Sequence, residues 1–287
     1  PALFRQLKRV VDENRRVPKN ASLFLLTGSA NLLALPKLSQ ALAGRMAVLT
    51  LLPFSAAERR RNGENVLRRL TNEPLALRLF KKTDLAEVIE GSTFPELALH
   101  PEINRTKWFD DYLTTILQRD VQSVASIRNP ERIVQLLVSL ALRVGSLVND
   151  SAVMKETGLD AKTYGKYKAI TKNTFLTFEV EPWSKPNKLN KRFVRQSKLY
   201  FTDTGLLCYI LRRNLRDVLT GDPVTAGHLF ENFIATEILK QTGTCIGTRI
   251  SHFNLAGGKE VDFVIEDAEG GVVGIEVKSA SALSERD

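Results

Sequence analysis

The sequence is poor in the residues that build disulfide frameworks and metal clusters. It contains 2 cysteines, Cys208 and Cys245, and this count excludes a disulfide framework or a cysteine-based zinc cluster. Its 3 histidines, His100, His228 and His252, are too far apart in sequence to form a metal-binding pair on one helix. Because a chain with so few cysteines fits a reducing compartment, we expect a cytoplasmic protein.

Long apolar runs and a leader pattern are also absent from the sequence. No stretch reaches the roughly 18 to 20 apolar residues that span a bilayer, and no charged-then-apolar leader opens the chain. We therefore expect no membrane partner and no secretion. The 287 residues, 43% hydrophobic and 25% charged, have the composition of an ordinary globular protein. The chain begins at Pro1 and not at Met, so we expect part of a longer gene product.

Acidic residues are scarce in the first two thirds of the chain. Residues 1–100 carry 16 basic and 9 acidic side chains, and residues 101–220 carry 20 and 12. Residues 221–287 reverse this balance, with 5 basic and 11 acidic side chains. The first two segments are therefore suited to attract a polyanion and the last to attract a cation. The alternative is that these charges only form solvated faces.

The first third has the pattern of half a parallel α/β sheet. The apolar run at 23–27 predicts a short buried strand, the spacing over 31–43 predicts a helix, and 46–52 predicts a second strand. Ser29 and Asn31 follow the first strand, where a parallel sheet presents its ligand-facing edge. There they could reach a water or a γ-phosphate; the alternative is that they are ordinary strand-end and helix-cap residues.

These residues resemble the AAA-type ATPases of bacteria and archaea that carry a further C-terminal domain. In that family a polar sensor residue follows the strand and an arginine precedes the next strand. Ser29 and Arg45 match those positions, and the run 52–58 continues the resemblance. The resemblance implies that residues 1–100 are the C-terminal part of an ATPase domain with a helical lid. It also implies that Ser29, Asn31 and Arg45 contact nucleotide and that the protein forms a homo-oligomer through this part.

The phosphate-binding loop of such ATPases is missing from this chain. No G-x-x-x-x-G-K-[S/T] sequence occurs in the 287 residues, and no apolar strand ending in paired acids precedes the first predicted strand. Without these parts the chain has no backbone cradle or lysine for the phosphates and no magnesium ligand. We expect that this chain alone does not hydrolyse ATP, and that the full-length protein binds ATP.

The middle of the chain has the element order of a winged helix. A short helix is expected over 152–157, a Gly-containing turn at 158–160 and a second helix over 161–172. This is the arrangement whose second helix enters the major groove of DNA. Strands near 174–180 and 192–201 would then form the wing.

Basic side chains gather on the second helix and on the wing of this unit, which we place within residues 101–220 after a helical segment. Most are lysines, which contact phosphates, whereas base edges are read mainly by Arg, Asn and Gln. We therefore expect DNA as a partner, bound with modest sequence preference; the alternative is a winged helix used only for protein packing. The candidate DNA contacts are Lys162, Lys166, Lys185, Lys188, Lys191, Arg192, Arg195 and Lys198.

The last third carries acidic residues and a lysine in a specific order. Asp262 lies on a predicted strand, and alternation places Glu276 and Lys278 on one face of the next strand. Glu231 lies on the preceding predicted helix. This order of acid and acid-x-lysine, with a glutamate from the leading helix, resembles the PD-(D/E)XK nucleases. The resemblance implies that residues 221–287 form a restriction-endonuclease-like α/β domain, clipped at its C-terminus.

The nuclease resemblance gives these four residues a catalytic role. In that family two acids hold Mg²⁺, which activates a bound water, and the lysine orients or deprotonates that water. Asp262 and Glu276 would then be the metal ligands, and Lys278 would orient or deprotonate the water. Glu231 would hold a water of a second metal ion or contact one of the metal ligands. The alternative is an inactive site, in which the acids survive on an inherited fold or pair with neighbouring lysines.

The order of the three parts is that of the same ATPase family, and the runs 200–207 and 227–232 strengthen the resemblance. We expect a multidomain α/β and α+β fold: a partial AAA-like unit, a helical and winged-helix middle, and the nuclease-like domain. The expected function is part of an ATP-binding, DNA-acting protein with a Mg²⁺-dependent endonuclease module. The alternative is an ATPase-linked DNA- or protein-binding adaptor or regulator with a catalytically inactive nuclease fold.

Overall fold

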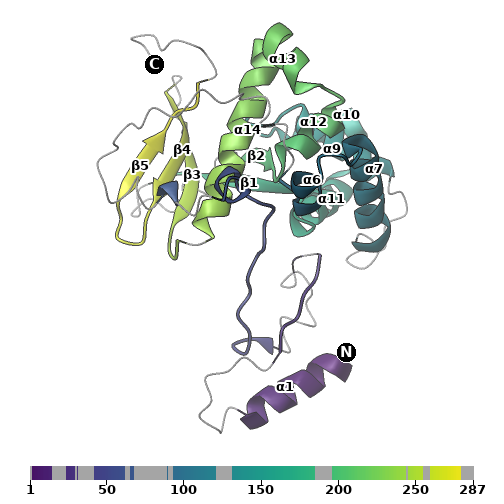
Figure 1. Cartoon of the computed structure of the whole chain (residues 1–287), viewed down its shortest axis with the longest axis vertical. Helices are drawn as coiled ribbons and strands as arrows, with labels where there is room; N and C mark the ends of the chain where they lie inside the picture. The colour runs from purple at the N-terminus through teal and green to yellow at the C-terminus, as the bar shows by residue number, and fades with distance from the viewer. Residues whose placement is uncertain are drawn as a thin grey trace.

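The computed structural model describes residues 2–14, 24–29, 31, 42–61, 65–67, 89, 93–120, 131–184, 196–243, 245–254 and 259–278. Within them a five-stranded mixed sheet and its helices form the main body, and helix α1 lies apart from it (Figure 1). This confirms the mixed α/β fold class that the sequence predicts. The helices are α1 (Ala2–Asn14), α3 (Ala56–Arg59), α6 (Pro95–Leu99), α7 (Arg105–Thr115), the π-helix η2 (Ile116–Asp120), α9 (Glu131–Ala141), α10 (Asp150–Thr157), α11 (Ala161–Asn173), α12 (Thr204–Leu211), α13 (Leu215–Gly221) and α14 (Pro223–Thr242). The strands are β1 (Thr177–Pro182), β2 (Lys198–Phe201), β3 (Arg249–Asn254), β4 (Glu260–Glu266) and β5 (Val272–Ile275).

The sheet joins strands from two of the expected domains. Its strand order is β2-β1-β3-β4-β5. Strand β1 pairs antiparallel with β2 and parallel with β3, while β3, β4 and β5 pair antiparallel in sequence order. The sheet therefore runs across the boundary expected at residue 220, so the strands of the predicted wing and of the predicted nuclease-like domain are hydrogen-bonded neighbours.

Helix α14 packs against this sheet, along β2 and β3 (Figure 1). Its buried residues include Leu229, Asn232 and Phe233, the i, i+3, i+4 spacing of a helix with one face in the core. Leu229 and Phe233 belong to a large hydrophobic cluster that also contains buried apolar residues of α9, α12, β2 and β4. Full burial of an apolar side chain such as Leu137 or Phe263 contributes about 1.5 to 3 kcal/mol.

Local sequence signals set the bounds of α10 and α11. The side chains of Asn149 and Asp160 cap the two helices by accepting backbone N–H groups of their first turns. Gly158 ends α10 with φ +63°, in the left-handed region that glycine enters without a steric penalty. The helix, turn and helix predicted over 152–172 are present, and β1 and β2 follow them as an antiparallel pair.

The segment that follows residue 52 is hydrogen-bonded to helix α14. The backbone N–H of Ala56 donates to Glu237 Oε2 at 2.8 Å, and Lys240 Nζ donates to the carbonyl oxygen of Phe54 at 3.0 Å. Burial lowers the pKa of Lys240, although Glu237 opposes this shift. These contacts connect residues 54–56 to helix α14.

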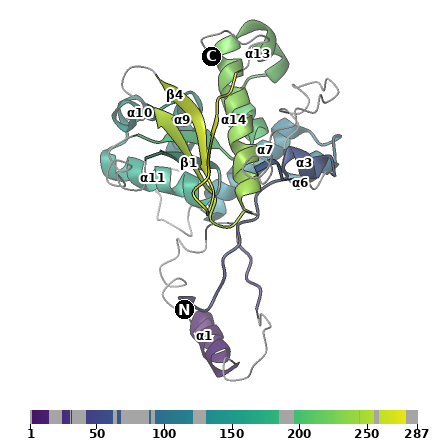
Figure 2. The ribbon, with the colours of Figure 1, turned by 90° about the vertical axis from the view of Figure 1, so that its left-hand side faces the viewer.

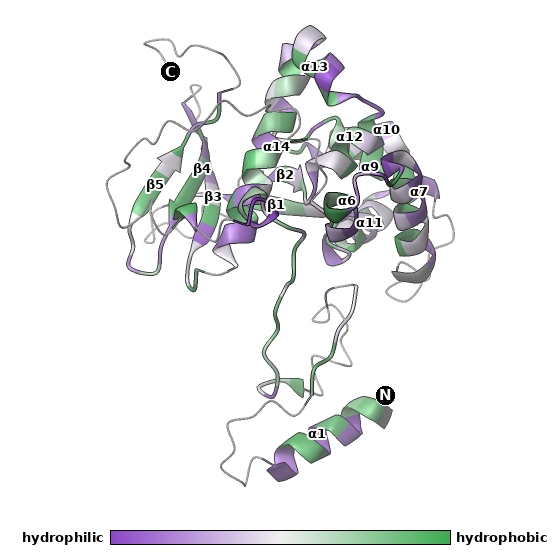
Figure 3. Ribbon diagram, in the orientation of Figure 1, coloured by the Kyte–Doolittle hydropathy of each residue, from purple (hydrophilic) through white to green (hydrophobic). Residues whose placement is uncertain are grey.

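The strands expected at 23–27 and 46–52 are not formed in the part of these segments that the structure describes. Leu25, Leu49 and Leu51 are 88%, 91% and 98% exposed. Figure 3 shows apolar colouring on the extended chain between α1 and the main body. A buried parallel strand needs hydrogen-bonded neighbours and covered faces. No described segment pairs with either run, so the apolar residues stay exposed. The helix expected over 31–43 falls almost entirely outside the described residues.

Helix α1 has its own small hydrophobic cluster, away from the sheet (Figure 2). Leu7 of α1 and Leu42 are buried in it, with Phe4 and Met46 packed against them. Among the helices that the structure describes, none combines the length and apolarity that a bilayer crossing requires.

Candidate functional site

Three acidic side chains from two elements, helix α14 and strand β4, converge on one lysine. Glu231 comes from α14, and Glu260 and Asp262 come from β4. Two residues apart on a strand, Glu260 and Asp262 point to the same face. Their carboxylates meet that of Glu231 around one further side chain, Lys198 of β2. We call these four residues the Lys198 centre.

The ammonium group of Lys198 fills this centre. Its Nζ lies 3.1 Å from Glu231 Oε1, 2.6 Å from Glu260 Oε1 and 2.9 Å from Asp262 Oδ1. The lysine side chain is 2% exposed. A lysine ammonium has three N–H donors, and three carboxylates surround it, so its hydrogen-bonding capacity is used within the centre.

Electrostatics keep Lys198 charged at this position. Burial by itself would lower the pKa of Lys198, but the charge of Glu231 and hydrogen bonds to Glu260 and Asp262 outweigh it, and the pKa is raised. The pKa of Glu231 is raised by burial, with Lys198 opposing the shift. Burial, and then the positive charge of Lys198, lower the pKa of the nearby His228. The centre is thus organised around a protonated amine.

Neighbouring groups make further contacts with the carboxylates of the centre. The hydroxyl of Tyr200, two residues along β2, donates to Glu231 Oε1 at 2.7 Å. The backbone N–H of Val277 donates to Asp262 Oδ2 at 2.9 Å. Gly145 lies against the carboxylate of Glu231, and a Cβ added to Gly145 would be 2.9 Å from Glu231 Oε2. These contacts hold the carboxylates in place.

The four residues that the nuclease resemblance assigns to catalysis are divided between two groups. Glu231 and Asp262 belong to the Lys198 centre. Glu276 and Lys278 form an ion pair of their own at 3.2 Å, with both side chains 36% exposed. The inactive-site alternative includes this kind of pairing between an acid and a neighbouring lysine.

The donor set does not fit the Mg²⁺ site that the resemblance implies. Mg²⁺ takes oxygen ligands at about 2.0 to 2.1 Å, yet both oxygens of Asp262 already accept hydrogen bonds, one from Lys198 and one from Val277. Within the described residues, no group of three or more His, Cys, Asp or Glu side chains that could hold a metal ion is found. We therefore assign no reaction step to a metal here.

Lys198 was expected to contact DNA, and the structure corrects this expectation. At 2% exposure with three carboxylate partners, its ammonium has no face left for a phosphate. Sequence reasoning also missed Glu260 as a partner of the centre. Its signal was the alternation of Glu260 and Asp262 along one strand.

Helix α11 presents a separate, basic face. Lys162 and Lys166 are exposed on it. Lys168 instead pairs with Asp150 and Glu179, both at 2.9 Å. Lys172 is exposed but also pairs with Glu179, at 2.5 Å. The wing candidates Lys185, Lys188, Lys191, Arg192 and Arg195 lie outside the described residues.

Two of the three expected nucleotide contacts, Arg45 and Asn31, have different partners within the chain. Arg45 forms an ion pair with Asp12 of α1, with Nε 2.6 Å from Oδ1. The backbone N–H of Asn31 donates to the carbonyl oxygen of Asn173, at the end of α11, at 2.7 Å. Ser29 is exposed at the end of the run 24–29.

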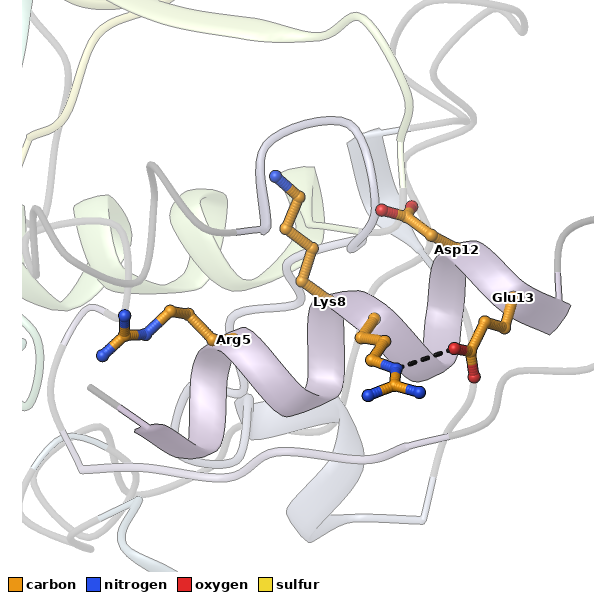
Figure 4. Close-up of a pocket in the computed structure, with 5 residues that line it drawn as sticks. Arg5, Lys8, Asp12 and Glu13 are labelled. Carbon is orange, nitrogen blue, oxygen red and sulfur yellow. Dashed lines mark hydrogen bonds and ion pairs between the residues drawn. The ribbon is translucent and has the colours of Figure 1, made fainter.

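A shallow pocket on α1 is lined by charged side chains of that helix, among them Arg5, Lys8 and Asp12 (Figure 4). Arg9 and Glu13 pair across one helical turn at 2.8 Å, and their side chains are 79% and 59% exposed. Exposed pairs of this kind are screened by solvent and contribute little. We assign no function to this pocket.

Comparison with known families relates the chain to AAA-type ATPases. Residues 1–59 match an AAA domain. Residues 82–217 and 226–287 match two domains of unknown function, DUF8612 and DUF4143. The match over residues 1–59 supports a relation to an AAA-like ATPase family. The expected resemblance of the N-terminal part to AAA-type ATPases is therefore supported.

Two curated relatives are uncharacterized proteins of Mycobacterium tuberculosis and Mycobacterium bovis. Each is 25% identical to this chain over 286 residues, a stretch that covers 99% of the chain and 57% of the relative. The chain thus spans little more than half the length of these relatives. No solved structure matches the chain.

Proposed function

We propose that this chain is the DNA-docking part of an AAA-type ATPase-associated protein, with α11 as the contact helix. The observation that carries the proposal is the exposed face of α11. Lys162 and Lys166 lie on this face together with Ala161, Gly165 and Ala169. The small residues allow close approach of a phosphate backbone, and the lysines supply positive charge.

The arrangement around α11 supports this function. It is the second helix after a tight turn, the position that enters the major groove in helix-turn-helix proteins. Tyr164, Tyr167 and Ile170 anchor its opposite face in the core. One side of the helix is thereby packed in the core, and the side that carries Lys162 and Lys166 is exposed. ATP binding and oligomer formation by the longer protein belong to the same proposal.

Replacing Lys162 and Lys166 by Ala together tests the docking helix. Each lost phosphate contact should reduce the slope of log affinity against log salt by about 0.9, so the double variant should lose about 1.8. Filter binding of duplex DNA over a salt series measures this slope. Lys107→Ala is the matched control, because Lys107 is an exposed lysine on α7 that pairs with Asp111. An unchanged slope in the double variant would show that α11 is not the DNA surface.

The Mg²⁺-dependent endonuclease is the second candidate function. One contact favours it: the N–H of Val277 donates to Asp262, which keeps the segment from Glu276 to Lys278 beside that acid. The occupation of the centre by Lys198 favours the non-catalytic alternative, and we propose that alternative for this chain.

A cleavage assay separates these two functions. Full-length protein is incubated with plasmid, single-stranded and branched DNA, with and without Mg²⁺ and ATP. For a non-catalytic unit, wild type and Asp262→Ala should give the same background on every substrate. Mg²⁺-dependent cleavage by wild type that Asp262→Ala abolishes would establish the nuclease instead.

A further inference from the structure

The Lys198 centre holds one cationic group, and that group is the ammonium of Lys198 itself. Three carboxylates surround the ammonium at 2.6 to 3.1 Å. Glu231 and Asp262 are largely buried, and Glu260 is 40% exposed, so without a cation these carboxylates would repel one another. We infer that Lys198 is the resident cation of this centre and takes the position that the nuclease resemblance gives to Mg²⁺. This inference concerns the carboxylate centre and goes beyond the DNA-docking function of α11.

The ammonium and a divalent ion exclude each other at this position. The nitrogen lies within hydrogen-bond distance of an oxygen from each carboxylate, at the point where the three side chains converge. A metal bound to those same oxygens would stand in the place of the ammonium and bring two positive groups together. Binding of Mg²⁺ here would therefore require the whole Lys198 side chain to leave a site in which it is 2% exposed.

The surroundings complete the centre for a lysine. Tyr200 donates to the Glu231 oxygen that also faces the ammonium. Asp262 uses one oxygen for Lys198 and the other for the Val277 N–H. Lys198 comes from β2, whereas its partners come from α14 and β4. The centre thus replaces a metal and also links the β1–β2 pair to the C-terminal unit.

The first experiment is a Mn²⁺ titration of the wild-type chain by isothermal calorimetry, with Asp262→Asn as the control. Mn²⁺ is the probe because it accepts the same oxygen ligands as Mg²⁺. If Lys198 is the resident cation, wild type and Asp262→Asn should give the same heats. Stoichiometric Mn²⁺ binding by wild type that disappears in Asp262→Asn would overturn the inference.

The second experiment removes the resident cation. Lys198→Met keeps most of the side-chain volume, and its Tm in EDTA should fall by about 10 °C because three carboxylates lose their counter-charge. Millimolar Mn²⁺ should then raise the Tm by about 5 °C, since the vacated position accepts a metal. The matched control is Lys168→Met, which removes another largely buried lysine with two carboxylate partners and should show no response to Mn²⁺.

A folded Lys198→Met variant whose Tm ignores Mn²⁺ would overturn the inference, because the ammonium would then not occupy a metal position. If the variant fails to fold in both EDTA and Mn²⁺, the wild-type titration decides the question by itself. Neither readout involves DNA, so this inference and the docking function fail separately.

Discussion

Asp203→Ala is expected to lower the free energy of unfolding by about 3 to 5 kcal/mol. Asp203 is fully buried and uses both carboxylate oxygens. Oδ1 accepts the N–H of Leu206 at 2.7 Å and caps α12, whereas Oδ2 accepts the N–H and the hydroxyl of Thr93 at 2.7 and 2.6 Å. The substitution would remove a helix cap and leave two buried donors of Thr93 without this acceptor. Urea denaturation followed by tryptophan fluorescence measures the change.

Asp160→Ala is the matched control for Asp203→Ala. Asp160 caps α11 in the same way, by accepting the N–H and the hydroxyl of Thr163 at 3.0 and 2.6 Å, but it is exposed. Its loss should cost about 1 kcal/mol, the usual value of a cap. The difference between the two losses measures what the bonds from Thr93 to Asp203 and the burial of this carboxylate add to a helix cap. Equal losses would show that this long-range bond contributes nothing to stability.

The elements that the sequence predicts well are those with local signals. Asn149, Gly158 and Asp160 mark the ends of α10 and α11, and each acts within a few residues of its position in the chain. The strand that the sequence predicts around Asp262 is also present, as β4. In this strand, the apolar run and the turn residues that bound it are also close in sequence.

The Lys198 centre could not be predicted in the same way. Lys198 is 33 residues from Glu231 and 64 from Asp262. Its sequence neighbours are basic, so it was interpreted as one more DNA contact, although the whole of β2 is buried. What decides its role is the tertiary fold, which brings side chains of β2, β4 and α14 together, and no local pattern encodes these long-range contacts.

The strand prediction for residues 46–52 is wrong for a related reason. Its apolar residues correctly indicate a segment that prefers burial and extended backbone. Whether such a run becomes a strand depends on the partners that pair with it. In the residues that the structure describes, no partner pairs with it, and Leu49 and Leu51 are exposed.

Gly145→Ala is expected to lower the free energy of unfolding by about 3 kcal/mol. Gly145 has φ +74°, where a side chain is strained by itself, and its added Cβ would lie 2.9 Å from Glu231 Oε2. Glu231 cannot move away at no cost, since Lys198 and the hydroxyl of Tyr200 both bind its other oxygen. The new methyl group should therefore disturb the Lys198 centre as well as the backbone. Equilibrium urea denaturation with an unchanged m-value measures the loss.

Gly158→Ala separates the two causes of this loss. Gly158 has φ +63°, and no atom lies within 4 Å of a Cβ added there. This variant carries the backbone strain alone, so its loss should be about 1 kcal/mol. Combining Gly145→Ala with Glu231→Ala gives a second comparison, because removing the carboxylate removes the close contact. The double variant should therefore lose less stability than the sum of the two single losses. If Gly145→Ala and Gly158→Ala cost the same, Glu231 is not held in place, and the Lys198 centre is looser than its hydrogen bonds indicate.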